Sequence, residues 1–503
     1  MKILKISALL LCLFMLASCG GSSGGTNNER EAAPVVGADE GAAEQRQEAE
    51  ENKRMDSDAP VKDFGGYEYR ILSRDESYQI WAGTDADAEE ENGDPINDAV
   101  YRRNRIIEDR FNILIVNKAS PDISGAARRA ITAGTDEYDI MMGPLANCFA
   151  DTLSMGGLLT VLKTVPYLDL PKPWYDQKAN DHLTIGKRLY VTVSDIGKVD
   201  KDATWSYLFN KKLVSDFSLE SPYQLVNSGE WTIDKMLELS KGVSRDLDGD
   251  GKMGIEDMYG YAGDTYNLYL ALLSSGSGVT AKDSDDLPIY IGLDDAGVSS
   301  FHKLLEMLGD KNLTLRADDH YSSGLPVWGG TGIMDSAFME NRVLFFDTSM
   351  ARVQFYRNMD SDFGIIPPPK RDAAQKEYIC TVSTFSTNSL CIPVTLPDYE
   401  RTGIITDALA AESRYTLIPA YYELQLKTKF ARDDESAEML DIIFAGRKFD
   451  LALIYDWGGV TSVFANAMQR NSPDIISALE KIEERIARDM AKTIDAYEEA
   501  ANN

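Results

Sequence analysis

The chain has 503 residues, 44% of which are hydrophobic, and its formal net charge at pH 7 is −30. A chain of this length usually forms more than one hydrophobic core, so a globular body with at least two lobes is expected. The negative field repels other polyanions, which excludes nucleic acid as a partner. Charge inside a cleft can oppose the overall sign, so the net charge does not identify a small ligand.

The chain begins with the features of a secretion signal. Two lysines precede an apolar run over residues 6–16, and Ala17 and Ser18 come just before Cys19. The run is shorter than the roughly 20 residues of a membrane-spanning helix, so residues 1–18 are predicted to be a cleaved signal peptide. The small-residue ending resembles the lipobox of bacterial lipoproteins, which implies that Cys19 is acylated and holds the chain at the extracellular face of the cell membrane. An ordinary signal peptide with an incidental cysteine is the alternative.

Residues 19–60 are predicted to form a flexible tether. Gly and Ser dominate its start, and residues 20–60 hold ten acidic residues, four basic residues and no aromatic residue. Such a segment buries too little apolar surface to offset the entropy of ordering, so it should be disordered. A random coil of this length spans about 35 Å, which is enough to hold a folded domain away from a surface.

The folded body is predicted to start near Val61 with an α/β pattern. Strands are expected over residues 67–72, 111–116 and 138–142, and helices over residues 94–110 and 123–133. This alternation with short turns favours a parallel sheet covered by helices on both faces. Residues 183–185 and 189–193 are predicted to add an antiparallel hairpin to that sheet.

The second half of the body mixes further strands and helices. Strands are predicted over residues 205–210, 343–346 and 363–366, and helices over residues 211–217, 232–242, 266–274, 298–308, 402–411, 436–445 and 473–500. Apolar residues in the last helix repeat every three or four positions. This stripe predicts a face packed on the core rather than a partner site.

The sharpest local motif is the acidic segment over residues 246–257. Acidic oxygens at loop positions 1, 3, 5 and 12, with glycine at position 6, are typical of an EF-hand calcium loop. The predicted ligands of a structural Ca²⁺ are the carboxylates of Asp246, Asp248, Asp250 and Asp257 and the backbone carbonyl of Lys252. Aspartate at position 12 is shorter than the usual glutamate, and an acidic turn that binds nothing is the alternative.

No catalytic motif accompanies this loop. The chain has three histidines, and its 81 acidic residues make any carboxylate pair uninformative. Cys380 and Cys391 could form a disulfide in an oxidising compartment, and buried free thiols are the alternative. Trp81, Trp328 and Trp457 lie in loop-like stretches, where binding residues concentrate.

Several segments occur in a characteristic order along the chain: Tyr138-Asp139-Ile140-Met141, Leu208-Phe209-Asn210-Lys211-Lys212-Leu213, Gly229-Glu230-Trp231-Thr232-Ile233-Asp234-Lys235-Met236 and Phe363-Gly364-Ile365-Ile366-Pro367. This order resembles the bacterial extracellular solute-binding proteins, the family-1-like receptors of ABC-type sugar importers. The third segment, followed by the acidic loop and Tyr259-Gly260, is similar to a stretch of lipoprotein members from Gram-positive bacteria. Many members of the family lack the acidic loop.

The resemblance implies a two-lobed, periplasmic-binding-protein-like α/β fold with crossover strands between the lobes. Residues 61–205 and 344–411 are expected in lobe 1, and residues 206–343 and 412–503 in lobe 2. It further implies a monomer without enzymatic activity that captures a small solute in the inter-lobe cleft and delivers it to ABC permease subunits. A neutral di- or oligosaccharide suits the negative charge better than a phosphorylated ligand.

The ligand is expected beyond the carboxyl ends of the strands, where open α/β sheets bind their ligands. The candidates are residues just after strands, with three tryptophans as stacking partners: Ser73, Arg74, Gly143, Asn147, Asp347, Thr348, Trp81, Trp328 and Trp457. Two other classes stay open. A surface-anchored glycosidase lacks any motif here, and a calcium-dependent cell-surface assembly protein of the dockerin kind needs a pair of such loops where this chain has one.

Overall fold

The computed structural model describes residues 54–356, 358–426 and 434–499. The chain divides into two compact units, residues 1–55 and residues 56–503. The predicted signal peptide, Cys19 and nearly all of the predicted tether lie outside the described residues, so these assignments stay predictions. Within the described part of the chain, no helix is both long and apolar enough to cross a membrane.

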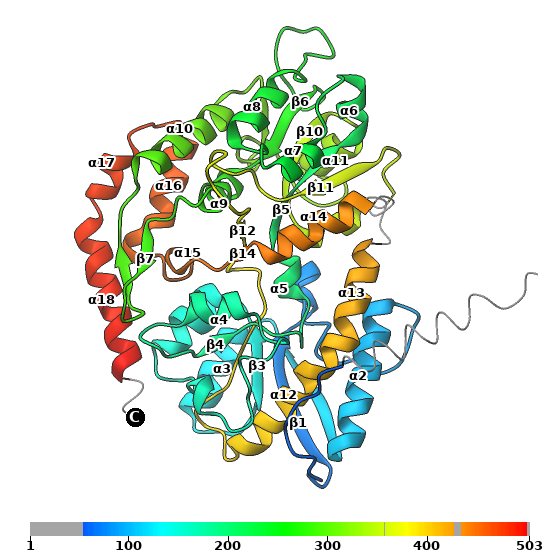
Figure 1. The fold of residues 1–503 in the computed structure, drawn as a ribbon, viewed down its shortest axis with the longest axis vertical. Coiled ribbons are helices and arrows are strands. Elements are labelled where there is room, and N and C mark those ends of the chain that lie inside the picture. The colour runs from blue at the N-terminus through cyan, green and yellow to red at the C-terminus, as the bar shows by residue number, and fades with distance from the viewer. Residues whose placement is uncertain (1–53, 357, 427–433, 500–503) are drawn as a thin grey trace, which may run out of the picture. The chain divides into compact units, whose positions relative to one another are not determined.

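Five strands form the first sheet, in the order β2-β1-β3-β13-β4. Figure 1 labels β1, β3 and β4 of this sheet. They are β1 (Tyr67–Arg74), β2 (Ile113–Ser120), β3 (Ile140–Gly143), β4 (Val191–Thr192) and β13 (Ser389–Cys391). Strand β1 pairs parallel with β2 and β3, whereas β13 pairs antiparallel with β3 and β4. The predicted parallel arrangement is therefore confirmed for the three strands that alternate with helices.

Capping residues in the sequence determine where the helices next to this sheet begin. The carboxylate of Asp94 accepts hydrogen bonds from the first-turn amides of α2 (Pro95–Phe111), and Pro95 fits the first turn because it has no amide hydrogen to satisfy. Asp122 caps α3 (Ile123–Thr132) in the same way. Of the predicted hairpin over residues 183–193, only the turn is confirmed: Ile185 and Arg188 form an antiparallel bridge. Leu183 ends α4 (Gln177–Leu183), and β4 joins the first sheet by pairing with the distant strand β13.

The second sheet has the order β11-β5-β10-β6-β9. Its strands are β5 (Trp205–Asn210), β6 (Tyr259–Gly263), β9 (Thr314–Arg316), β10 (Val343–Ser349) and β11 (Phe363–Ile366). The expected start of lobe 1 at residue 344 is wrong, because β10 and β11 both pair antiparallel with β5 of the second sheet. The chain returns to the first sheet only at β13.

Helices packed in the second core include α8 (Ile233–Lys241), α9 (Thr265–Ser274) and α10 (Asp295–Gly309). Trp231 lies just before α8, is fully buried, and donates from Nε1 to the carbonyl oxygen of Pro367 at 2.9 Å. Other elements include α6 (Lys211–Asp216), α7 (Pro222–Ser228), α11 (Ile333–Met339), α13 (Leu417–Leu426) and a hairpin of β7 (Thr280–Lys282) and β8 (Pro288–Tyr290).

Crossover segments connect the two sheets. The short helix α5 (Val199–Asp202) leads from β4 into β5, while β12 (Cys380–Thr381) pairs in parallel with β14 (Arg447–Lys448). A buried ionic network joins them: Asp200 accepts from Arg447 Nη2 at 2.7 Å and lies 3.4 Å from Lys201 Nζ. These contacts confirm the predicted crossovers.

The C-terminal region serves both cores. It comprises α12 (Tyr399–Tyr415), α14 (Asp434–Ala445), α15 (Leu451–Tyr455), α16 (Val460–Gln469), α17 (Ile475–Glu480) and α18 (Glu483–Glu499). The single helix predicted over residues 473–500 is therefore two helices. The apolar stripe of α18 packs Ile486, Met490 and Tyr497 into the core of the first sheet, so the assignment of all of residues 412–503 to lobe 2 is also wrong. Cys380 and Cys391 are buried free thiols, and Cys148 is also buried.

Candidate functional site

Loops at the carboxyl ends of strands enclose two neighbouring cavities. Residues 75–94 leave β1 at Arg74 and line both of them. The larger cavity has a volume of about 780 Å³. The smaller, of about 590 Å³, combines this loop with α5 of the crossover and with Gln354, which follows β10 of the second sheet; its lining includes Gln79, Ile80, Lys198, Asp202, Gln354 and Tyr421. Residues carried by both sheets therefore meet at one hollow.

Carboxylates dominate the larger cavity. Those lining it are Asp75, Glu76, Asp87, Glu89 and Glu90. Arg74 also lines it, but this side chain is only 3% exposed and its Nη2 donates to the carbonyl oxygens of Ser386, at 2.7 Å, and Thr387. Burial lowers the pKa of Arg74 to about 10. The lining therefore disfavours an anionic ligand and offers acceptors to hydroxyl groups.

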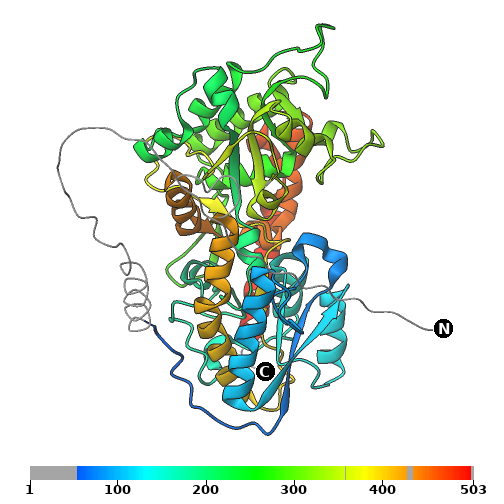
Figure 2. The ribbon, with the colours of Figure 1, turned by 90° about the vertical axis from the view of Figure 1, so that its right-hand side faces the viewer.

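An aromatic group lies at the ends of β6 and β9 in the second sheet. Tyr321 is 56% exposed, and its hydroxyl donates to Asp264 Oδ2 at 3.2 Å. The same hydroxyl accepts a hydrogen bond from Trp328 Nε1 at 3.0 Å. The guanidinium of Arg352 lies over the Trp328 ring, 5.0 Å from its centroid. In Figure 2 the loop that follows β9 and the loop over residues 75–94 project on the same side of the body.

A second aromatic row reaches the crossover. The rings of Trp205 and Tyr266 meet edge to face at 6.2 Å, and Tyr266 meets Phe385 at the same centroid distance. Phe385 is 42% exposed. The hydroxyls of Tyr266 and Ser383 are 3.3 Å apart, which links the second sheet to the segment that leads into β13. Exposed rings beside polar groups are typical of sites that bind sugars or other amphipathic ligands.

Of the ligand-binding residues predicted on the first sheet, all except Arg74 lie outside the linings of the two cavities. Ser73 is buried and donates to Asn117 Oδ1 at 2.7 Å. Gly143 is packed so closely that a Cβ atom there would lie 3.2 Å from the ring of Phe149. Asn147 is exposed, with a positive φ of 56°, and Trp81 is partly exposed. Of the predicted set, Arg74 alone both ends its strand and lines a cavity.

Of the ligand-binding residues predicted on the second sheet, two are buried within the sheet and Trp328 lies in a loop. Asp347 and Thr348 are buried, and the Asp347 carboxylate accepts from Tyr207 Oη at 3.1 Å and from Tyr261 Oη at 2.8 Å. Burial raises the pKa of Asp347 to about 7. Trp328 joins the aromatic group described above.

Trp457 is wrongly predicted as a stacking residue. It is 2% exposed, belongs to the core of the first sheet, and donates from Nε1 to Thr493 Oγ1 of α18 at 2.8 Å. The glycines that follow it indicate a loop in the sequence. That signal cannot reveal that α18 covers the ring.

Sequence reasoning missed Asp264, Tyr321, Tyr266, Arg352 and Phe385. Asp264 directly follows β6, so the strand-end rule that selected Asp347 would also have selected it. Tyr321 comes within seven residues of Trp328 and shares its loop, which is a usable signal. Tyr266, Arg352 and Phe385 have no such local signal, because contacts distant in the sequence bring them to the site.

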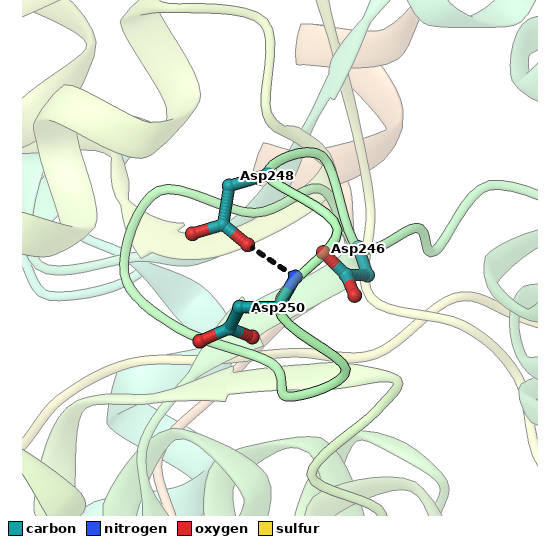
Figure 3. A group of neighbouring side chains, drawn as sticks. All are labelled: Asp246, Asp248 and Asp250. Atoms are coloured by element: carbon teal, nitrogen blue, oxygen red, sulfur yellow. Dashed lines mark hydrogen bonds between the residues drawn. The ribbon is translucent and has the colours of Figure 1, made fainter.

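The acidic loop brings three of its predicted carboxylates together (Figure 3). Asp246, Asp248 and Asp250 each offer an oxygen atom within 4.8 Å of the others. Asp246 accepts from the amides of Gly249 at 2.6 Å and Gly251 at 2.9 Å, and these hydrogen bonds lower its pKa. Both glycines have positive φ angles, of 74° and 81°, which only glycine adopts readily.

The last predicted ligand, Asp257, has a different role from the other three. It is buried and accepts from the amides of Leu247 and Gly254, so it closes the loop from inside. Lys252 donates its amide to Asp250 Oδ1 at 2.8 Å. The loop thus turns at its two glycines, while its twelfth residue accepts from backbone amides.

Comparison with known proteins identifies the fold of the chain but assigns it to no sequence family. No protein-family model matches the chain, and no curated protein matches it significantly. Solved structures do match. An ABC substrate-binding protein from Listeria monocytogenes in complex with cycloalternan aligns with a TM-score of 0.51 at 12% identity, over 86% of this chain and 100% of that one.

Two further structures match equally well. A solute-binding protein of an ABC transporter from Thermotoga lettingae, bound with α-D-tagatose, aligns with a TM-score of 0.51 at 14% identity over 85% of this chain and 100% of that one. UgpB from Mycobacterium tuberculosis, in complex with glycerophosphocholine, aligns with a TM-score of 0.51 at 14% identity over 86% and 99%. The chain therefore has the two-lobed α/β fold of the solute-binding proteins of ABC transporters.

Proposed function

We propose that this chain is the extracellular binding protein of an ABC importer, and that it captures a di- or oligosaccharide and delivers it to the permease. The observation that carries the proposal is the cavity of about 590 Å³ lined by residues of both halves and of the crossover between them. Its volume lies within the roughly 300–1,000 Å³ of small-molecule sites. The structural neighbours are binding proteins, and the neighbour from Listeria holds a cyclic saccharide.

The side chains of the candidate site favour a neutral, hydroxyl-rich ligand. Exposed rings such as Tyr321 and Phe385 can stack on the apolar faces of pyranoses. Carboxylates and amides accept from and donate to sugar hydroxyls. The carboxylates of the adjoining cavity would repel a phosphorylated sugar.

A ligand screen tests this proposal. Purified protein is heated with neutral oligosaccharides, monosaccharide phosphates, amino acids and short peptides, and its melting temperature is measured. We expect stabilisation by one or more oligosaccharides, confirmed by calorimetric titration, and compaction of the particle in solution scattering. Stabilisation by peptides or phosphates alone would contradict the proposed ligand class, and hydrolysis of a bound saccharide would favour the glycosidase alternative.

We also propose that acylation of Cys19 retains the protein at the outer face of the membrane. The support is the signal-like start with its lipobox-like ending, followed by a long polar segment. Such a segment would allow a tethered body to reach a permease in the same membrane.

We further propose that the loop over residues 246–257 holds a structural Ca²⁺. The support is the convergence of the carboxylates of Asp246, Asp248 and Asp250 on one point, together with the glycines that permit the turn. These charges repel one another, so a bound cation would stabilise the loop. In the second sheet's half the loop lies between α8 and β6 and would act on stability rather than on ligand binding.

A further inference from the structure

The most exposed aromatic ring of the candidate site is held in place by a chain of hydrogen bonds. Tyr321 lies in the loop after β9 and is 56% exposed, so burial contributes little to fixing its orientation. Its hydroxyl donates to Asp264 Oδ2 and accepts from Trp328 Nε1, so two directional bonds aim the ring. Trp328 is itself held by Phe346, stacked at 6.1 Å, and by the guanidinium of Arg352.

Asp264 is anchored at the inner end of this chain. It is the N-cap of α9, and its Oδ1 accepts from the amide of Asn267 at 2.7 Å. Its two oxygens therefore have separate partners, one in the helix and one in the loop. A carboxylate at a helix N-terminus is favoured by the helix dipole, and its hydrogen bonds are stronger than those of a neutral acid.

We propose that Asp264 is a positioning residue that holds Tyr321 as a stacking ring for the ligand, and that the ionised form of Asp264 is the form that binds the ligand tightly. The inference deepens the proposed function and rests on it for the identity of the ligand as a saccharide. It assigns the ring that meets the sugar to Tyr321, with Trp328 as its support.

The groups around Asp264 determine the pH at which its carboxyl group ionises. The titratable groups that face it are Asp318 of the turn after β9, Asp347 of β10, and the hydroxyls of Tyr261, Tyr266 and Tyr321. In the described part of the chain, no lysine or arginine forms an ion pair with it. Burial raises the pKa of Asp264 to about 6, and the charge of Asp318 adds to the rise.

The direction of the pH effect follows from these contacts. Above pH 6 the carboxylate is charged and its bond to the Tyr321 hydroxyl is charge-assisted. As the pH falls through about 6, protonation weakens that bond, because a charge-assisted hydrogen bond is about twice as strong as a neutral one. Ligand affinity should therefore be about fivefold lower at pH 5.0 than at pH 7.5.

Asp264→Asn separates positioning from folding. Asparagine is as good an N-cap as aspartate, so α9 should keep its start. We expect this variant to bind with the low-pH affinity at every pH, about fivefold weaker than the wild type at pH 7.5. Tyr321→Phe keeps the ring but removes the hydroxyl, and should have the same effect. Tyr167→Phe, at an exposed tyrosine of the other half, is the matched control and should behave as the wild type.

The test has one arm without ligand and one with it. In the first, the fluorescence of Trp328 is isolated by subtracting the spectrum of Trp328→Phe and is titrated from pH 4.5 to 8. We expect a transition near pH 6 that disappears in Asp264→Asn and in Tyr321→Phe, and that moves to lower pH in Asp318→Asn because a neighbouring charge is removed. No transition in the wild type would overturn the inference.

In the second arm, maltotetraose and raffinose are titrated calorimetrically at pH 5.0 and 7.5. If either binds with the expected pH dependence, and the two variants lose that dependence, the inference holds. Equal affinity at both pH values, or unchanged binding in Tyr321→Phe, would overturn it even if the first arm shows the transition. If no saccharide of the wider screen binds, the proposed function fails, while the first arm still decides whether Asp264 controls the orientation of the rings.

Discussion

The buried ionic network at the crossover gives the sharpest prediction about stability. Asp200 of α5 is fully buried and faces Arg447 and Lys201, which are also buried. Asp200→Asn keeps the size of the side chain and removes its charge. Breaking a buried pair costs about 3–5 kcal/mol, because the remaining charge stays out of water.

Other ion pairs of the network reduce the expected loss of unfolding free energy. After the substitution, Arg447 still pairs with Asp176 at 3.3 Å and Lys201 still pairs with Asp195 at 3.2 Å. Both cations therefore retain an anionic partner. We therefore expect Asp200→Asn to lower the free energy of unfolding by about 2–3 kcal/mol. The measurement is urea unfolding at pH 7, followed by circular dichroism.

A matched control lies on the surface. Asp216 pairs with Lys212 at 2.5 Å, but both side chains are about half exposed. Asp216→Asn should change the free energy of unfolding by less than about 0.5 kcal/mol, because solvent screens such pairs. If the two variants lose similar amounts, the crossover network does not stabilise the fold and the reasoning from burial is refuted.

Three further predictions concern the anchor, the loop and the second core. Cys19→Ala should release the folded body from the membrane fraction of cells, and continued sedimentation with membranes would contradict acylation. Chelation should lower the melting temperature of the wild type but not that of Asp248→Ala, and ligand affinity should be the same in both; identical melting of the wild type in chelator and in millimolar calcium would argue against a Ca²⁺ site. Burial raises the pKa of Asp347 to about 7 from its usual 3.8, so its contribution to stability is complete below pH 3.8 and is lost as the pH rises through about 7. Asp347→Asn should therefore lose less stability between pH 5 and pH 8 than the wild type does, as measured by urea unfolding at both pH values.

Local patterns predicted most individual elements. The helix expected over residues 94–110 is α2 (Pro95–Phe111), because capping Asp94, first-turn proline and apolar spacing are all read within one segment. The strand over residues 363–366 is also found with the same bounds. The acidic loop keeps its turn for the same reason, since its glycines and aspartates bond within a few residues of one another.

Assignments that depend on distant contacts failed. Nothing within β10 indicates that β5, more than a hundred residues earlier, pairs with it, so the border between the lobes was misplaced. Trp457 shows the same limit at the level of one side chain, because α18 folds back to bury it. The aromatic group of the candidate site is assembled from α9, the loop after β9 and the segment after β10, and only the fold brings these together.

The short helix α5 connects the candidate cavity with the crossover. Lys198, just before the helix, and Asp202 at its end line the smaller cavity and pair with each other at 2.6 Å. Asp200 and Lys201, between them, belong to the buried network. A ligand in this cavity would therefore lie beside a helix in which Asp200 pairs with Arg447 of β14. In the proposed function, a change in the angle between the halves must move α5, and α5 cannot move without altering the wall that the ligand contacts. In the proposed function we therefore expect ligand occupancy and the arrangement of the two halves to be coupled through α5.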